Sequence, residues 1–196
     1  MKKSRTRELV SSLLWIAVVL AGRAALADQY TVPSGSMEPT VQVGDRIAVV
    51  KAAYGLRVPL TERWFARWAE PARGDVVMLD APDTGIVLLK RVVALPGDVV
   101  AVRRGAVVVN GERVPWRLDG DAVLELSDAG PHPLGLDRGG GPDFGPTTVP
   151  AGRVLVLGDH RGDSRDGRYF GFVTEDAVLG RAAGVFWRGG FTWRHL

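Results

Sequence analysis

Short apolar runs, broken by glycine, proline and aspartate, dominate the chain after Tyr30. Runs of this length that are rich in Val, Ile and Leu are typical of β-strands rather than helices. They predict strands near residues 41–50, 75–80, 85–94, 98–103, 106–109 and 153–157. The pair Asn110-Gly111 follows one of these runs and marks a tight hairpin. The pattern therefore predicts a mainly β, antiparallel domain over residues 28–196.

Three stretches of this domain interrupt the strand pattern. Residues 60–69 place Trp64, Phe65 and Trp68 at helical spacing, which predicts a helix with an aromatic face directed either into the core or towards a membrane interface. Residues 130–146 contain six Gly and four Pro, too many for the interior of an element, so a flexible insertion is expected over about residues 117–148. The last six residues, FTWRHL, fit either a strand docked on the core or another interfacial contact.

The N-terminus combines a basic leader, residues 1–8, with an uncharged and largely apolar run over residues 9–22. One interpretation is a secretory signal that is cut after Ala25-Leu26-Ala27. The other is a transmembrane helix over residues 9–27, with Arg23 reaching the far interface. Both interpretations place the rest of the chain outside the cytoplasm, because the basic residues precede the apolar run.

Charge and composition exclude several classes of function. The net charge of +3 resides in residues 1–8, and the remaining residues balance at 21 basic and 21 acidic side chains, which leaves no nucleic-acid footprint. The absence of cysteine excludes disulfides, thiolate metal sites and a Cys nucleophile. The three histidines share no ligand spacing, and no phosphate-binding glycine motif occurs, so neither a metal nor a nucleotide is expected.

Three segments could carry chemistry. In PSGSMEPT, residues 33–40, two prolines restrain a turn that could present a nucleophilic hydroxyl, although an ordinary turn has the same composition. Lys90 lies within an apolar strand of a chain that has only four lysines, so it either extends to the surface or is buried as a neutral amine able to take a proton from a serine. Residues 158–171 alternate Arg and Asp, which predicts a stiff ion-pair network.

Four motifs in a fixed order carry a resemblance to one family. PSGSMEPT, RGDVV at 73–77, KRVVALPGD at 90–98 and GDHRGDSRDGRYFGFV at 158–173 follow a basic and apolar N-terminus. Together they resemble the bacterial type I signal peptidases over about residues 5–187. The resemblance implies a membrane-bound serine endopeptidase with a Ser/Lys dyad on a mostly β domain. Such an enzyme needs no cofactor and cuts the signal peptides of exported preproteins after small residues.

The resemblance also implies roles for individual residues. By motif position, Ser36 is the expected nucleophile, Lys90 the general base, and Ser34 an oxyanion donor beside the Ser36 backbone N–H. Ser164 is expected to orient Lys90, and Asp166 and Arg168 to hold their loop as an ion pair. The pockets for small substrate side chains are expected to be lined by Val32, Met37, Leu88 and Leu89.

Some positions depart from the family pattern, and two other functions remain open. His160 stands where the family usually has Asn, and it invites a rival Ser/His site, which the intact Lys90 motif disfavours. The resemblance favours an uncleaved, single-pass anchor in the lipid bilayer, with residues 1–8 inside and the domain on the extracytoplasmic side. The alternatives are a maturation peptidase for one dedicated substrate and a non-catalytic, membrane-tethered domain that binds exported proteins.

Overall fold

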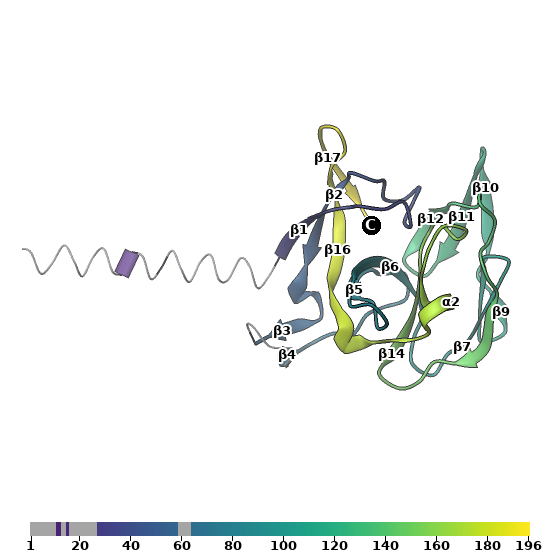
Figure 1. The fold of residues 1–196 in the computed structure, drawn as a ribbon, viewed down its shortest axis with the longest axis horizontal. Helices are drawn as coiled ribbons and strands as arrows, with labels where there is room; N and C mark the ends of the chain where they lie inside the picture. Colours follow the sequence, from purple (N-terminus) through teal and green to yellow (C-terminus); the bar gives the residue numbers. More distant parts are fainter. Residues whose placement is uncertain (1–10, 13–14, 16–26, 59–63) are drawn as a thin grey trace, which may run out of the picture.

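The computed structural model describes residues 11–12, 15, 27–58 and 64–196. These residues form antiparallel sheets, so the mainly β fold predicted from the sequence is confirmed (Figure 1). The leader and nearly all of the expected anchor lie outside the described residues. Among the residues that are described, no helix is long and apolar enough to cross a membrane.

The largest sheet has eight strands and contains the strand that carries Lys90. Its order is β1-β2-β16-β5-β6-β14-β15, and β17 pairs with β16. The strands are β1 (Ala27–Thr31), β2 (Arg46–Val50), β5 (Val76–Asp80), β6 (Val87–Ala94), β14 (Arg153–Leu157), β15 (Val173–Thr174), β16 (Val178–Trp187) and β17 (Phe191–His195). Two 3-10 turns, η1 (Lys51–Ala53) and η2 (Glu175–Ala177), and the short helix α2 (Gly167–Phe170) connect them.

Three smaller sheets complete the described fold. A four-stranded sheet has the order β13-β7-β8-β9, a three-stranded sheet the order β10-β11-β12, and β3 pairs with β4. Their bounds are β3 (Gly55–Arg57), β4 (Trp64–Arg67), β7 (Val99–Arg103), β8 (Ala106–Val109), β9 (Glu112–Arg113), β10 (Trp116–Asp119), β11 (Ala122–Ser127), β12 (Gly130–Leu134) and β13 (Phe144–Thr148). Figure 1 shows β6 and β14 between the half that contains β1, β2 and β16 and the half that contains β7 and β9–β12.

Three apolar clusters form the core. One packs the turn residue Met37 against Val41, Met78 and other side chains of the large sheet. The second fills the space around β7, β8 and β14, and the third surrounds Tyr54 and the inner side chains of β5 and β14. Alternate residues of β5 enter different clusters, Val76 and Met78 the first and Val77 and Leu79 the third, as the period of two in a β-strand requires.

The predicted strands match the structure closely, and so does the predicted hairpin. β5, β6, β7, β8 and β14 lie where the apolar runs indicated, whereas only residues 46–50 of the run at 41–50 are a strand. Val109 pairs with Glu112, so Asn110 and Gly111 form a two-residue turn. Both have positive φ, 53° and 86°, which is the backbone that Asn-Gly favours in such hairpins.

The helix predicted over residues 60–69 is wrong where the structure describes it. Trp64–Arg67 is strand β4, and its side chains alternate between partly buried and exposed. Trp64 packs between the guanidinium groups of Arg57 and Arg67, 4.4 and 5.5 Å from its ring, whereas Phe65 is 75% exposed. Pairing with β3 therefore overrides the helical spacing, and the three aromatic residues do not share one face.

Residues 130–146 contain more regular structure than their composition indicated. β12 and β13 occupy both ends of this stretch, so the expectation that it lacks elements is wrong. Pro131 and Pro133 are compatible with β12 because this strand lies at the edge of its sheet, where one side of the backbone needs no partner. The flexibility expected for residues 117–148 stays a prediction.

The C-terminal residues form a strand. β17 pairs with β16, yet Phe191 is 83% and Trp193 49% exposed. The strand therefore docks through its backbone and directs these two aromatic side chains outward.

Candidate active site

The turn that carries Ser36 lies between β1 and β2 and is anchored in the core by a buried side chain. Met37 is 1% exposed and packs in the first core cluster. The Glu38 N–H donates to the Gly35 carbonyl, and the Val41 N–H donates to the Met37 carbonyl, both at 2.9 Å. Ser36 is half-buried and Ser34 is exposed. The turn is thus fixed by its backbone while both hydroxyls stay near the surface.

Lys90 projects from β6 and meets Ser36. Its side chain is 1% exposed, and Nζ donates to Ser36 Oγ at 2.7 Å and to the Leu89 carbonyl at 2.9 Å. Burial lowers the pKa of Lys90 from 10.5 to about 8, although the negative charges of Asp166 and Asp159 act in the opposite direction. Of the two outcomes considered for Lys90, burial rather than extension to the surface is therefore the one observed.

The segment that follows β14 closes over this pair. The His160 N–H donates to the Ser36 carbonyl at 3.2 Å. Gly158 lies so close that a Cβ atom at its position would overlap both the Ser36 carbonyl oxygen and Ser164 Oγ. Only glycine therefore allows these two serines to pack against the same point of the backbone.

Asp166 and Arg168 form a fully buried ion pair in the same segment. Arg168 donates from Nε to Asp166 Oδ1 and from Nη2 to Asp166 Oδ2, each at 2.8 Å. Asp166 Oδ2 also accepts a hydrogen bond from the Gly158 N–H at 3.0 Å. This is the ion-pair network that alternating Arg and Asp residues predicted, and it ties α2 to the residue beside Ser36.

The side chains of Ser164 and His160 form no hydrogen bond with the Ser36–Lys90 pair. Ser164 is buried, and within the described part of the chain its hydroxyl has no hydrogen-bond partner, so the expected orientation of Lys90 by Ser164 stays a prediction. The imidazole of His160 lies 2.8 Å from the carboxylate of Asp137. Ser36 Oγ meets Lys90 instead, and this geometry disfavours the rival Ser/His site.

The four residues expected to line substrate pockets divide between two clusters. Val32, Met37 and Leu89 belong to the cluster beneath the Ser36 turn, whereas Leu88 packs with the cluster around Tyr54. Leu88 and Leu89 are half-buried, and the other two are buried.

β6 has an unpaired edge next to the dyad. β5 pairs with residues 87–91 of β6, but β14 pairs only with Arg91, Val92 and Ala94. In the described structure, residues 87–90 therefore present one edge that no strand occupies. Such an edge can accept an extended peptide.

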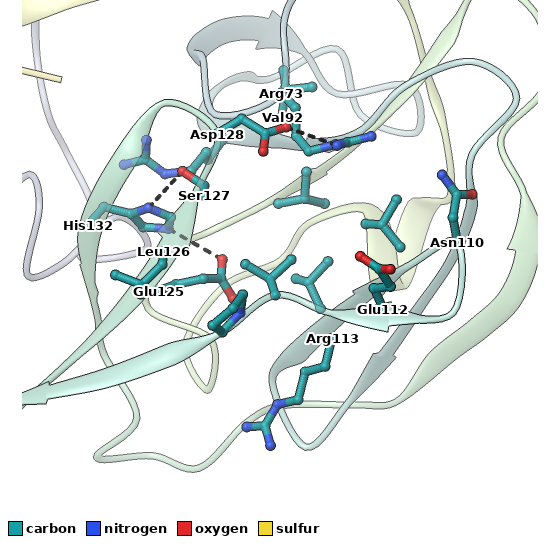
Figure 2. A pocket seen from close by; sticks show the side chains of 16 residues that line it. Arg73, Val92, Asn110, Glu112, Arg113, Glu125, Leu126, Ser127, Asp128 and His132 are labelled. Carbon is teal, nitrogen blue, oxygen red and sulfur yellow. Dashed lines mark hydrogen bonds and ion pairs between the residues drawn. The ribbon is translucent and has the colours of Figure 1, made fainter.

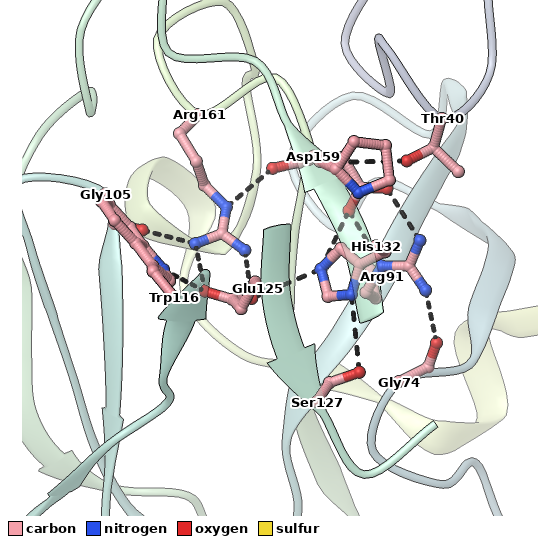
Figure 3. A network of polar contacts seen from close by, with 12 residues as sticks. Thr40, Gly74, Arg91, Gly105, Trp116, Glu125, Ser127, His132, Asp159 and Arg161 are labelled. Carbon is pink, nitrogen blue, oxygen red and sulfur yellow. Dashed lines mark hydrogen bonds and ion pairs between the residues drawn. The ribbon is translucent and has the colours of Figure 1, made fainter. Parts of the chain in front are cut away.

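Sequence reasoning missed a buried polar network behind the dyad. Arg91 makes two hydrogen bonds to Asp159, from Nε at 2.9 Å and from Nη2 at 2.7 Å, and Arg161 makes two to Glu125 (Figure 3). His132 lies between the two carboxylates. The sequence carried one signal for this network, namely that Arg91 is a charged residue within an apolar strand. The neighbouring Lys90 has the same property, and only Lys90 was interpreted as functional.

A pocket of about 250 Å³ lies on the far side of this network (Figure 2). Valines of β6 and β8 form much of its wall, and Arg73, Asn110, Ser127 and His132 contribute polar groups. Neither Ser36 nor Lys90 lines it, so it is separate from the dyad. Residues 27–58 and 64–196 contain no cluster of three or more His, Asp or Glu side chains that could hold a metal ion.

Comparisons with known proteins find relatives over most of the chain. The chain is 34% identical over 192 residues to "Signal peptidase I" of Pseudomonas fluorescens, which covers 86% of this chain and 68% of that protein. It is 34% identical over 187 residues to "Probable signal peptidase I-2" of Synechocystis, covering 92% of this chain and 72% of that protein. It is 33% identical over 188 residues to "Signal peptidase I" of Bacillus licheniformis, covering 94% of this chain and 90% of that protein.

The family model described as signal peptidase, peptidase S26, matches residues 5–187. This match includes the Ser36 turn, β6 and the segment after β14. The chain therefore belongs to the signal peptidase family, the S26 serine peptidases.

Proposed function

We propose that this chain removes signal peptides from exported proteins, with Ser36 as nucleophile and Lys90 as general base. One observation carries the assignment of the dyad: a lysine that is 1% exposed lies with Nζ 2.7 Å from the hydroxyl of a half-buried serine. Burial favours the neutral amine, and a neutral amine at this distance can accept the serine proton.

The reaction is an acyl transfer in two steps. Lys90 takes the proton of Ser36, and Ser36 Oγ attacks the carbonyl carbon of the scissile bond. The Ser34 hydroxyl and the Ser36 N–H stabilise the oxyanion, and the protonated Lys90 returns the proton to the leaving amine. Water activated by Lys90 then hydrolyses the acyl-enzyme. Ser164 helps to orient Lys90, and no cofactor takes part.

The signal peptide binds as an added strand along the open edge of β6. Main-chain hydrogen bonds to residues 87–90 supply affinity, and pockets lined by alternate side chains supply specificity. We place these pockets beside Ser36 at Val32, Met37 and Leu89, which pack together in the cluster beneath the Ser36 turn. Small residues at the first and third positions before the cut suit such pockets, and Leu88 completes their wall.

The chain acts at the membrane. The basic residues 1–8 stay in the cytoplasm, and the apolar segment expected at 9–27 spans the lipid bilayer once, ending before Ala27, which belongs to β1. Residues 28–196 form the extracytoplasmic peptidase domain. This arrangement brings the open edge of β6 to the side of the membrane where exported preproteins emerge.

The test is cleavage of a preprotein with an Ala-x-Ala site by the full chain in detergent, with the products identified by mass spectrometry. We expect one cut directly after the second alanine and no cut by the Ser36→Ala variant. Wild-type protein that binds the preprotein without cutting it would support the tethered binding domain instead. Cleavage of only one preprotein among many would support the dedicated maturation peptidase.

A further inference from the structure

His132 on β12 lies buried between two carboxylates that come from different parts of the fold. Its side chain is 7% exposed, and Nε2 lies 3.4 Å from Glu125 Oε2 and 3.9 Å from Asp159 Oδ1 (Figure 3). Glu125 belongs to the neighbouring strand β11, and Asp159 to the segment that closes over Ser36. The imidazole therefore bridges the three-stranded sheet and the active-site segment.

The groups nearest to the two ring nitrogens carry acceptor oxygens, although Nε2 makes no hydrogen bond among the described residues. Nδ1 lies 3.5 Å from Ser127 Oγ, whose single proton is donated to the Gly130 carbonyl at 2.9 Å. Ser127 therefore offers a lone pair to Nδ1, and Nε2 faces carboxylate oxygens. Both ring nitrogens face acceptors, and an imidazolium, which has two N–H donors, fits this arrangement.

The two carboxylates also have guanidinium partners. Arg91 holds Asp159, and Arg161 holds Glu125. Burial alone raises the pKa of both acids, but Arg161 and His132 bring that of Glu125 down to about 2, and Arg91 and His132 keep that of Asp159 below its ordinary value. Two arginines and the His132 imidazole thus face two acids whose pKa values lie below their ordinary range, in a closed space.

This cluster continues directly into the dyad. Arg91 follows Lys90 in β6, and Asp159 follows Gly158, the residue that packs on Ser36. The main chain of Asp159 is also held by the residue that follows the strand of His132, since its carbonyl accepts from the Gly135 N–H at 3.0 Å. A shift of Asp159 would therefore move both Gly158 and the His160 N–H that bonds the Ser36 carbonyl.

We propose that His132 is a positioning residue for the peptidase reaction: by bridging Glu125 and Asp159, it holds the Arg91–Asp159 pair against the back of the Ser36–Lys90 dyad and balances its charge. The proposal rests on the proposed function of that dyad. It also assigns a role to the β10–β12 sheet, which supplies both His132 and Glu125.

The direction of the effect on Lys90 follows from charge. The carboxylates of Asp159 and Asp166 favour the charged form of Lys90, against the larger effect of burial. A cationic His132 weakens the field of Asp159, and Arg91 does the same from the other side. Removal of the imidazole leaves more negative charge near Lys90, so protonated Lys90 becomes more stable and the base works only at higher pH.

The first test compares His132→Gln with two controls. The full chain in detergent is assayed for kcat/KM against pH with a signal-peptide substrate. For His132→Gln we expect the midpoint of the rise in activity to move upward by about half a pH unit or more. His195→Gln makes the same chemical change at the exposed C-terminus and should leave the midpoint unchanged, and His132→Lys, which restores a cation, should move the midpoint back. A lower rate with an unchanged midpoint in His132→Gln would show a structural role only and overturn the proposal.

The second test needs no change at His132. In the inactive Ser36→Ala chain with 15N-labelled histidine, the His132 ring signals should shift in one step at the pH where Lys90 loses its proton. The Lys90→Met variant should abolish that step. A His132 signal that ignores Lys90 would overturn the proposal even if the wild-type enzyme is active. Conversely, failure of wild-type protein to cleave signal peptides would remove the proposed function while this coupling could still be measured.

Discussion

Lys90 Nζ lies 2.7 Å from Ser36 Oγ although 54 positions separate the two residues. The contact forms because the Ser36 turn is anchored through Met37 on the large sheet and Lys90 projects from β6 of that sheet. An arginine in place of Lys90 could make a similar hydrogen bond, but it could not lose its proton. The proposed chemistry therefore depends on the amine itself.

Both members of the dyad should be required for cleavage. Ser36→Ala removes the nucleophile, and Lys90→Arg keeps a cation but provides no base, so each should lower kcat/KM by about 10³-fold or more in a preprotein cleavage assay. His160→Ala should retain most of the activity, because its imidazole contacts Asp137 rather than Ser36. An inactive His160→Ala chain beside an active Lys90→Arg chain would contradict the dyad.

The buried amine also predicts how stability depends on pH. The pKa of Lys90 is about 8 in the folded chain and 10.5 for an ordinary lysine. Between these values the unfolded chain binds more protons than the folded chain, so the free energy of unfolding rises with pH. Relative to Lys90→Met, the free energy of unfolding of the wild type should rise by about 3 kcal/mol as the pH rises across this window. Below pH 8 the difference between the two proteins should stay constant. Urea unfolding of both proteins at several pH values measures the difference, and parallel curves would show that Lys90 is not buried in solution.

Gly158→Ala should disrupt the site although it replaces none of the reactive side chains. The added Cβ would overlap the Ser36 carbonyl oxygen and Ser164 Oγ, so the segment after β14 must move away from the dyad. We expect loss of most activity and a stability cost of about 1–3 kcal/mol. Gly190→Ala is the matched control, since a Cβ there meets nothing within 4 Å and should change neither property. Equal behaviour of the two variants would show that the segment is not packed on Ser36.

Two hydroxyls near the dyad should have separable effects. Ser34→Ala removes a proposed oxyanion donor, so kcat should fall by about 10²-fold or more. Ser164→Ala should slow the reaction less, because it alters the environment of Lys90 and not the base itself. Ser164 Oγ has no hydrogen-bond partner among the described residues, so its loss should not lower Tm. Thermal unfolding and steady-state kinetics of both variants check this, and a stronger kinetic effect at Ser164 would reverse the assigned roles.

The sequence predicted most of the strands because they depend on local patterns, whereas the roles of Ser36 and Lys90 rest on the family resemblance. Apolar runs locate β5–β8 and β14, and Asn110-Gly111 locates a hairpin. The prediction failed at Trp64, where the spacing of aromatic residues resembled a helix but pairing with β3 determines a strand. It failed again at Pro131 and Pro133, because only the order of strands reveals that β12 is an edge.

The network around His132 could not be predicted for a different reason. Arg91 and Asp159 lie within two of the motifs, but Glu125 and His132 come from separate stretches that belong to none of them. Their pairing depends on how the β10–β12 sheet packs against the segment after β14, a long-range relationship that no local pattern records. The segments of Ser36 and Lys90, in contrast, were recognisable because together with two other motifs they follow the fixed order of a known family.

Near the N-terminus, Ala25-Leu26-Ala27 resembles a cleavage site for this same activity. Ala27 and Asp28 belong to β1 and pair with Val50 and Val49 of β2, and Asp28 accepts a hydrogen bond from Lys51 at 2.9 Å. To be cut, the bond after Ala27 has to lie extended beside the Ser36 turn of another copy of the chain. Because Ala27 and Asp28 are already paired with β2, this bond is not free to bind there. The chain should therefore stay in the membrane fraction after an alkaline carbonate wash, with its N-terminus intact by mass spectrometry. Asp28→Ala removes the hydrogen bond between Asp28 and Lys51 and should increase cleavage after Ala27. A wild-type chain that begins at Asp28 and is released from the membrane would show that β1 does not protect the bond and that residues 9–27 are a cleaved signal.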